Sequence, residues 1–167
     1  LSVRHSLGDC ISFDMGGTSS DICLIRDGKP EWTVDAVIGG FPIRIPMIDV
    51  HTVGAGGGSV IWVDSGGGLR VGPRSAGSNP GPACYGFGGE EPTTTDAHME
   101  VGSLQTEFFK GKGIPFRPEA GTEALRKVGS EVGMEPAETA VAALQVVNHG
   151  LAKEIRAVCL TRGFDAS

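Results

Sequence analysis

The feature that most constrains the fold of this chain is a short polar turn between two apolar segments. The turn reads Asp-Met-Gly-Gly-Thr-Ser-Ser-Asp over residues 14–21, and it is flanked by apolar residues at 11–13 and 22–25. Branched and aromatic residues favour strands, whereas Gly, Asp and Ser favour turns. The pattern therefore predicts two strands, over residues 10–14 and 21–26, joined at a glycine-rich bend.

The composition of this turn is that of an anion-binding site. Gly16 and Gly17 allow the backbone to approach an anion closely. Hydroxyl side chains and several backbone amides follow them at Thr18, Ser19 and Ser20. Because Mg²⁺ on phosphates is usually held by one or two carboxylates, Asp14 is the leading metal-linked residue. The structural alternatives are a tight hairpin with a polar tip, an Asp14 that accepts turn amides, and an Asp21 that stabilises the far side of the bend.

Two well-known phosphate motifs are excluded at this turn. No Gly-Lys-Ser/Thr follows it, as a P-loop requires, and it does not open a long helix as the dinucleotide GxGxxG motif does. The turn resembles instead the phosphate loops of the actin, Hsp70 and sugar-kinase superfamily, in which two such loops face each other across a cleft. That resemblance implies that one loop is half of a site.

The chain has two parts of different character. The 27 glycines concentrate between residues 39 and 89, so residues 1–117 read as a strand-rich and glycine-rich part. Further strands are expected over residues 32–38, 50–53, 60–63 and 69–71. Helical spacing predicts helices over residues 119–132 and 136–162, and Thr95 is a candidate cap for a short helix over residues 96–104. One apolar stripe of the last helix is expected in the core: Ala140, Leu144, Val147, Leu151, Ile155 and Val158.

Three further positions carry alternatives that the residues leave open. Asp49 and His51 share one face of a strand, so they form either an acid/base pair or a hydrogen-bonded strand end. The glycine run that includes Gly56, Gly57 and Gly58 either presents amides to phosphate or permits close backbone packing. Asp96 either approaches a cation in a cleft or caps the amides of a helix.

Charge and cysteine usage narrow the class of protein. A formal net charge of −6 without a basic block argues against a nucleic-acid partner. No apolar run reaches the length of a membrane span, so no membrane partner is expected. Four cysteines without CxxC spacing indicate reduced thiols rather than a zinc site or a disulfide framework. These observations favour a cytoplasmic location.

Longer motifs make a family resemblance specific. They are the glycine run with its preceding strand at residues 45–59, a Gly-Pro-rich segment at residues 72–86, and Pro-Thr-Thr-Thr-Asp-Ala at residues 92–97. Together with the turn at residues 14–21, they resemble the hydantoinase A/5-oxoprolinase family, which includes acetone and acetophenone carboxylase subunits. The matching motifs run in order from Phe13 to Gly163.

This resemblance implies an α/β fold, with a mixed sheet that bears glycine-rich loops and is backed by helices. Such a fold is similar to one ribonuclease H-like half of the actin/Hsp70/sugar-kinase superfamily. The resemblance also implies ATP and Mg²⁺ as cofactors and an ATP-dependent opening of a cyclic amide such as a hydantoin or 5-oxoproline. The alternatives are a fragment of an ATP-dependent acetone or acetophenone carboxylase subunit, and a noncatalytic nucleotide-binding or assembly domain.

The same resemblance implies that residues 1–167 are a single internal domain of a longer chain. Family members carry a second loop of the DxGGT type near their N-terminus, and this sequence has none. The expected partners are the remaining domains of a parent chain and a hydantoinase B-type subunit or domain. By itself, the fragment is then expected to be inactive.

Overall fold

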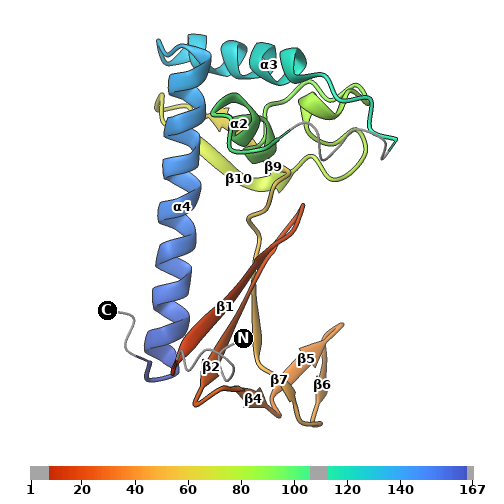
Figure 1. Cartoon of the computed structure of the whole chain (residues 1–167). Coiled ribbons are helices and arrows are strands. Elements are labelled where there is room, and N and C mark those ends of the chain that lie inside the picture. The colour runs from red at the N-terminus through yellow and green to blue at the C-terminus, as the bar shows by residue number, and fades with distance from the viewer. Residues whose placement is uncertain (1–7, 106–112, 165–167) are drawn as a thin grey trace. The chain divides into compact units, whose positions relative to one another are not determined.

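The chain has an α/β fold with antiparallel sheets and helices, and the computed structural model describes residues 8–105 and 113–164 (Figure 1). The strands are β1 (Cys10–Met15), β2 (Ser20–Arg26), β3 (Lys29–Pro30), β4 (Trp32–Thr33), β5 (Ala36–Ile38), β6 (Phe41–Ile43), β7 (Met47–Ile48), β8 (Val50–Val53), β9 (Ser59–Val63) and β10 (Leu69–Ser75). The helical elements are the 3₁₀ turn η1 (Ala83–Tyr85) and the helices α2 (Thr94–Glu100), α3 (Pro118–Glu131) and α4 (Pro136–Thr161).

The described residues form two compact units. Unit 1 contains residues 8–14, 20–53 and 154–164, and unit 2 contains residues 15–19, 54–105 and 113–153. The strands end at Ser75 and the helical elements begin at Ala83, so the boundary near residue 117 that composition predicts does not separate strands from helices. The compact units cross it, because α3 and the first part of α4 belong with β9, β10 and α2.

In unit 1, β2 organises the larger sheet. It pairs with β1, β3 and β8, and its antiparallel register with β8 sets Ser20 opposite Val53. Alternate side chains of β2 are buried, with Ile22 at 0% and Leu24 at 3% exposure. This is the two-residue period of a strand that is covered on one face.

The strand predicted over residues 32–38 is interrupted in the structure. The Asp35 amide donates to the Thr33 side-chain oxygen at 3.1 Å, and this local bond turns the backbone out of the strand ladder. The chain forms the short strands β4 and β5 instead, which pair with β7 and β6 respectively. Gly39 and Gly40, at φ 59° and 85°, close the hairpin of β5 and β6, because its two-residue turn requires positive φ at both positions.

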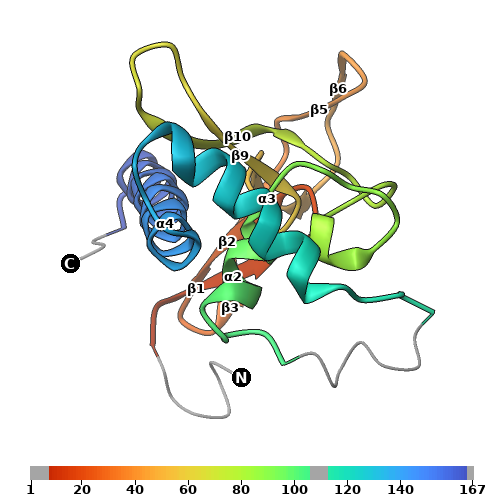
Figure 2. The ribbon, with the colours of Figure 1, turned by 90° about the horizontal axis from the view of Figure 1, so that it is seen from above.

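Unit 2 is built around the antiparallel hairpin of β9 and β10, in which Val63 lies opposite Leu69. Helix α2 packs between this hairpin and α3, as Figures 1 and 2 show. The core takes one or two residues from each layer: Ile61, Ala97, Leu125, Ala140 and Ala143. Helix α3 ends before Gly133, whose φ of 71° suits a helix C-terminus and confirms the predicted break.

Helix α4 follows the predicted apolar stripe in part, because Ala140, Val147 and Leu151 are buried whereas Leu144, Ile155 and Val158 are only half-buried. Its buried positions recur at helical spacing at Ala140, Ala143, Val147, Leu151 and Cys159. Its N-terminus is capped by Glu138, which accepts a hydrogen bond from the Glu135 amide at 3.0 Å. Among the described residues, no helix combines the length and apolar character that a membrane span needs.

Candidate functional site

In unit 2, the turn after β1 and the glycine run before β9 are bonded to each other through their backbones. The turn is closed by the Gly16 amide, which donates to the Ser19 carbonyl at 2.8 Å. The Gly57 amide donates to the Gly16 carbonyl at 2.9 Å, and the Gly58 amide donates to the Gly17 carbonyl at 2.6 Å. Two glycine-rich segments that lie about forty residues apart in sequence thus form one double layer.

Close packing is the reason for glycine in the second segment. An ideal Cβ on Gly56 would lie 2.8 Å from the backbone carbonyls of Gly16 and Gly17. A Cβ on Gly57 would lie 2.8 Å from the Thr95 hydroxyl, and one on Gly58 would lie 2.9 Å from the Ser75 hydroxyl. These contacts are shorter than packed atoms allow. Since the amides of Gly57 and Gly58 are already bonded, the structure supports the packing alternative for this run over the presentation of its amides to phosphate.

A cavity of about 210 Å³ opens beside this double layer. We call it the hydroxyl pocket, and it is lined by Gly17, Thr18, Gly58, Gly77, Ser78, Pro82, Tyr85 and Thr95. Four of these residues carry hydroxyl groups, and none carries a formal charge. Among the described residues, no hydrogen bond in turns or loops uses the amides of Gly17 or Thr18. The pocket therefore offers hydroxyl and amide donors to an acceptor-rich ligand.

Thr95 and Tyr85 form the wall of the hydroxyl pocket that comes from α2 and η1. The Thr95 hydroxyl and the Thr95 amide each donate to the Gly57 carbonyl, both at 2.8 Å. Burial raises the pKa of the Tyr85 phenol above its ordinary value. Tyr85 therefore stays protonated at neutral pH and remains able to donate a hydrogen bond.

Asp96 is a buried structural carboxylate, with 1% exposure. Its Oδ1 accepts the Cys84 amide at 2.7 Å, and its Oδ2 accepts the Thr93 amide at 2.7 Å and the Thr93 hydroxyl at 2.8 Å. With Thr93 as the N-cap of α2, it forms a capping box. These contacts correspond to the capping alternative that the sequence left open for Asp96, and they correct the cap from Thr95 to Thr93. Since both of its oxygens are engaged, we assign Asp96 no part in metal binding.

The other predicted residues near the turn differ in exposure. Asp14 is exposed at the end of β1, and Thr18 is exposed in the turn. Ser20 lies in β2 with a buried side chain, so it is not placed to meet an external anion. The Asp21 side chain accepts a hydrogen bond from the Thr52 hydroxyl at 2.7 Å, across the pairing of β2 with β8. Asp21 thus stabilises the sheet.

In unit 1, Asp49 and His51 lie two residues apart and both are paired with residues from the end of the chain. Asp49 Oδ2 lies 2.6 Å from a guanidinium nitrogen of Arg162, and His51 Nε2 lies 3.8 Å from a carboxylate oxygen of Glu154. The His51 and Glu154 side chains are about half exposed, at 49% and 42%. Asp49 lies between β7 and β8 and not in a strand, so the alternation predicted for one strand does not include it. Its contact with Arg162 and that of His51 with Glu154 involve partly exposed side chains, and such contacts stabilise a fold only weakly.

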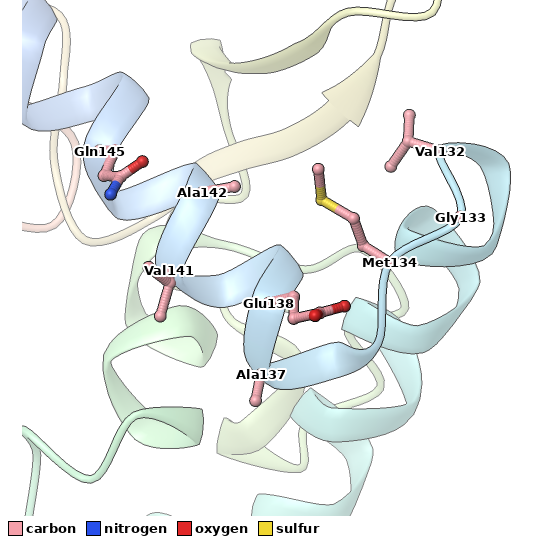
Figure 3. A pocket seen from close by; sticks show the side chains of 8 residues that line it. All are labelled: Val132, Gly133, Met134, Ala137, Glu138, Val141, Ala142 and Gln145. Atoms are coloured by element: carbon pink, nitrogen blue, oxygen red, sulfur yellow. The ribbon is translucent and has the colours of Figure 1, made fainter.

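Two other hollows of unit 2 differ in chemistry from the hydroxyl pocket. One, of about 500 Å³, has at its wall the ion pair of Arg74 and Glu91, in which hydrogen bonding lowers the pKa of Glu91 and raises that of Arg74. The other is an open groove of about 680 Å³ where α3 turns into α4. Figure 3 shows its lining, with Val132 and Met134 from the turn and Val141 from α4. That lining is mainly apolar, and the carboxylate at its edge, Glu138, serves as the α4 cap.

Sequence reasoning left the loop that holds Tyr85 open between a substrate or phosphate wall and an interdomain contact, and it did not single out Ser78. Tyr85 and Ser78 lie in a Gly-Pro-rich segment without periodicity, which indicates a loop but not what the loop faces. Thr95 was considered only as a helix cap. The sequence did contain a signal for the true cap, because Thr93-Thr94-Thr95-Asp96 fits the capping-box pattern with Thr93 in the first position. With Thr93 as the cap, the Thr95 side chain is available for a contact elsewhere.

Comparison with known proteins gives a consistent result. The hydantoinase/oxoprolinase family profile matches residues 1–167. Caprolactamase subunit alpha of Pseudomonas jessenii is 42% identical over 168 residues, a match that covers 99% of this chain and 24% of that protein. The 5-oxoprolinase of Saccharomyces cerevisiae is 38% identical over 167 residues, covering 92% of this chain and 13% of that protein. The chain therefore spans a quarter or less of the length of these relatives.

Solved structures agree with the sequence matches. The crystal structure of the ATP-dependent caprolactamase from Pseudomonas jessenii superposes with a TM-score of 0.86 at 41% identity, over 98% of this chain and 24% of that one. The nucleotide-free structure of an acetone carboxylase, from work on ATP-dependent acetone carboxylation, superposes with a TM-score of 0.82 at 25% identity, over 98% of this chain and 23% of that one. Both neighbours have the actin-like ATPase fold.

Proposed function

This chain belongs to the hydantoinase/oxoprolinase family, and from that premise we propose that it supplies nucleotide-phosphate contacts in an ATP-dependent enzyme that opens cyclic amides. Similarity to a caprolactamase and to a 5-oxoprolinase supports the cyclic-amide class, because the substrates in both names are lactams. The chain covers only part of each relative. The complete activity therefore belongs, in this proposal, to a larger assembly.

The observation that carries the proposal is the hydroxyl pocket beside the double glycine layer. Its volume of about 210 Å³ lies below the range of roughly 300–1,000 Å³ that is typical for drug-sized ligands. Such a volume suits one or two phosphoryl groups better than a whole nucleotide. The amides of Gly17 and Thr18, with the hydroxyls of Thr18 and Ser78, are donors that a phosphate can use.

The chemistry explains why a lactam-opening enzyme needs ATP. An unstrained amide carbonyl is a poor electrophile, and transfer of a phosphoryl group to its oxygen creates a leaving group before water attacks. Catalysis of such a transfer depends mainly on positioning and on stabilising charge on the phosphoryl oxygens. The proposed part of this chain in that step is to hold the phosphate with fixed donors in the hydroxyl pocket.

Mg²⁺ fits the chemistry of the donors near the turn. This cation takes oxygen ligands and commonly uses one or two carboxylates together with phosphates and waters. The described residues hold no group of three or more His, Cys, Asp or Glu side chains arranged for a metal ion. We therefore propose Asp14, which is exposed two residues before Gly16, as the protein carboxylate and the nucleotide phosphates as the main ligands. A bound Mg²⁺ would neutralise charge on the phosphates.

The proposed partners are the remaining domains of a longer polypeptide and a hydantoinase B-type subunit or domain. The name of the caprolactamase relative, a subunit alpha, supports an assembly of more than one chain. The four free cysteines support a cytoplasmic location, where thiols stay reduced.

The second candidate is that this chain forms part of an ATP-dependent carboxylase. The superposition on an acetone carboxylase favours it, because that protein shares the fold and is linked to ATP-dependent acetone carboxylation. Turnover by the assembled enzyme separates the two functions. A cyclic-amide hydrolase forms ADP when 5-oxoproline, a hydantoin or caprolactam is added as the substrate. A carboxylase forms ADP only when a ketone and bicarbonate are added. Binding of MgATP without turnover on either set would identify a noncatalytic nucleotide-binding domain.

The phosphate role itself is tested by calorimetry of the chain with MgATP. We expect weak binding, since the chain offers one glycine turn of the kind that faces a second turn in related enzymes. Ser78→Ala should weaken this binding by about tenfold, the effect of one hydrogen bond to a charged group. The matched control is Ser65→Ala, an exposed serine in the turn between β9 and β10. Equal affinities of the two variants would refute the assignment of phosphate to the hydroxyl pocket.

A further inference from the structure

Residues 31–49 of unit 1 form a ribbon of paired strands, which we call the arm. At its base, the Asp49 amide donates to the Glu31 carbonyl at 2.9 Å. Next to the base β4 pairs with β7, and farther along the ribbon β5 pairs with β6. Within the described residues, each of these two sheets has only two strands (Figure 1). The arm is therefore a strand pair that no third strand supports.

The arm is apolar but has no core. None of its described side chains is buried. Its large apolar side chains are among the most exposed of the chain: Trp32 at 62%, Val37 at 67%, Phe41 at 74% and Ile45 at 58%. An isolated two-stranded hairpin is at best marginally stable in water, and a large exposed apolar surface marks a site of interaction. These two facts indicate that another polypeptide covers the arm.

Both faces of the arm are open at its tip. Val37 in β5 lies directly opposite Pro42 in β6, so these two side chains share one face. Phe41 is the neighbour of Pro42 in the same strand, so its side chain points to the other face. A flat partner surface would cover only one of the two exposed side chains, Val37 or Phe41. A cleft would cover both.

The charge pattern of the arm indicates the chemistry of that cleft. No charged residue lies between Ala36 and Ile43, and the tip is bounded by Asp35 and Arg44. The centre of a protein interface is poor in charged residues, and its rim is polar. A matching cleft is therefore apolar inside, with polar or charged groups at its mouth.

The aromatic side chains of the arm supply much of the area that an interface needs. A buried aromatic side chain covers about 150–250 Å², so the exposed parts of Trp32 and Phe41 offer on the order of 200–300 Å². This is about a third of the ~800 Å² that each partner buries in a stable interface. The other exposed apolar residues of the arm, which include Val37 and Ile45, add to it.

We propose that the arm is a subunit-docking element, whose tip inserts Val37 and Phe41 into an apolar cleft of a second, hydantoinase B-type subunit. A separate subunit is favoured because the caprolactamase relative, of which this chain covers 24%, is itself named a subunit alpha. This inference rests on the assembly proposed above and not on the phosphate-binding role.

The test measures binding of a purified hydantoinase B-type subunit to the full-length polypeptide that contains this chain. Val37→Ser and Phe41→Ser should each weaken the complex by about thirtyfold or more, as the loss of an anchor in a cleft does. The matched control is Phe87→Ser, which removes an aromatic side chain of unit 2 that is 47% exposed and should leave the affinity unchanged. Equal urea midpoints of the three variants, expected for exposed side chains, show that the fold is kept.

Each alternative occupant gives a different result. A loss of affinity in only one of Val37→Ser and Phe41→Ser would indicate a flat contact, and affinities equal to that of Phe87→Ser would remove the arm from the interface; both would overturn the proposal. Hydrogen exchange of residues 36–43 that is equally slow with and without the second subunit would assign the arm to another domain of the same polypeptide. Self-association of the polypeptide that Phe41→Ser abolishes would assign it to a second copy. Either result would also overturn the proposal.

Failure of this inference is distinguishable from failure of the proposed phosphate function. Neither Val37 nor Phe41 lines the hydroxyl pocket, so both variants should bind MgATP in calorimetry as the unchanged chain does. Subunit binding that survives both substitutions would overturn the role of the arm and leave the phosphate function intact. Subunit binding that depends on both side chains supports the arm whether or not MgATP binds.

Discussion

Gly56→Ala tests most sharply whether the glycine run serves close packing. The new Cβ would lie 2.8 Å from three backbone atoms, namely the Gly16 carbonyl oxygen and the carbonyl carbon and oxygen of Gly17. None of these atoms can rotate away as a side chain can. The two segments must therefore either accept the overlap or separate.

Both responses destabilise unit 2 by a similar amount. Overlap in a packed interior costs about 1–3 kcal/mol. Separation loses the bonds from the Gly57 and Gly58 amides to the turn, and each of them is worth about 0.5–1.5 kcal/mol. We expect Gly56→Ala to lower the free energy of unfolding of unit 2 by about 1–3 kcal/mol, a substantial part of the ~5–15 kcal/mol that is typical of a folded domain.

The assay is urea unfolding followed by the fluorescence of Trp62, which lies in β9 and donates to the Gly72 carbonyl at 2.8 Å. Replacing the exposed Trp32 of unit 1 by Phe leaves Trp62 as the single tryptophan. The control is Gly54→Ala in the same loop, because an added Cβ there meets no atom within 4 Å. If Gly56→Ala unfolds at the same urea concentration as Gly54→Ala, the close-packing argument is refuted.

Three further predictions concern single ionisable side chains. Asp14→Asn should lower ATP-dependent turnover of the assembled enzyme at least about tenfold, or 1.4 kcal/mol, if its carboxylate helps to hold Mg²⁺; unchanged turnover and magnesium dependence would return it to a structural role. Burial lowers the pKa of His98, so the unfolded chain binds more protons. The stability of unit 2 is then complete above the ordinary histidine pKa and falls as the pH drops through the lower pKa of the folded state; His98→Gln should flatten this slope in urea midpoints measured between about pH 7.5 and 5.5. His51→Gln should change the free energy of unfolding by less than about 1 kcal/mol and leave turnover near normal, as its half-exposed contact with Glu154 at 3.8 Å implies. A large loss of turnover in stable His51→Gln would instead restore the acid/base hypothesis.

Elements that carry a local signal could be predicted from the sequence. The strands around the first glycine turn follow from apolar segments on both sides of turn residues, and β1 and β2 match them within one residue. Helices α3 and α4 follow from apolar spacing and from Gly133 between them. The prediction of one strand over residues 32–38 was wrong because a single hydrogen bond from the Asp35 backbone amide to the Thr33 side chain, too local to alter the apolar pattern, breaks it.

The candidate site could be predicted only in part, because its contacts join distant segments. The glycines of the first turn were recognisable by composition. The second glycine run has the same composition, yet the amides of Gly57 and Gly58 donate hydrogen bonds to carbonyls of the first turn. The sequence of residues 54–58 does not indicate that these residues pair with the first turn. Asp49 and His51 show the same limit, since strand alternation predicted neither that Asp49 lies outside β8 nor that Arg162 and Glu154 contact these two residues.

Asp96 explains how uncharged groups alone come to line the hydroxyl pocket. A carboxylate that faced the pocket would repel a phosphate, but this one is buried and engaged by donors from Thr93 and Cys84. Those bonds fix the start of α2 and the middle of η1, the two elements that carry Thr95 and Tyr85. The Asp96 carboxylate therefore fixes the two elements that carry Thr95 and Tyr85, although Asp96 itself does not line the hydroxyl pocket. Gly121 completes the arrangement, because an ideal Cβ there would lie 2.8 Å from Asp96 Oδ1, so α3 can cover the carboxylate only where a side chain is missing.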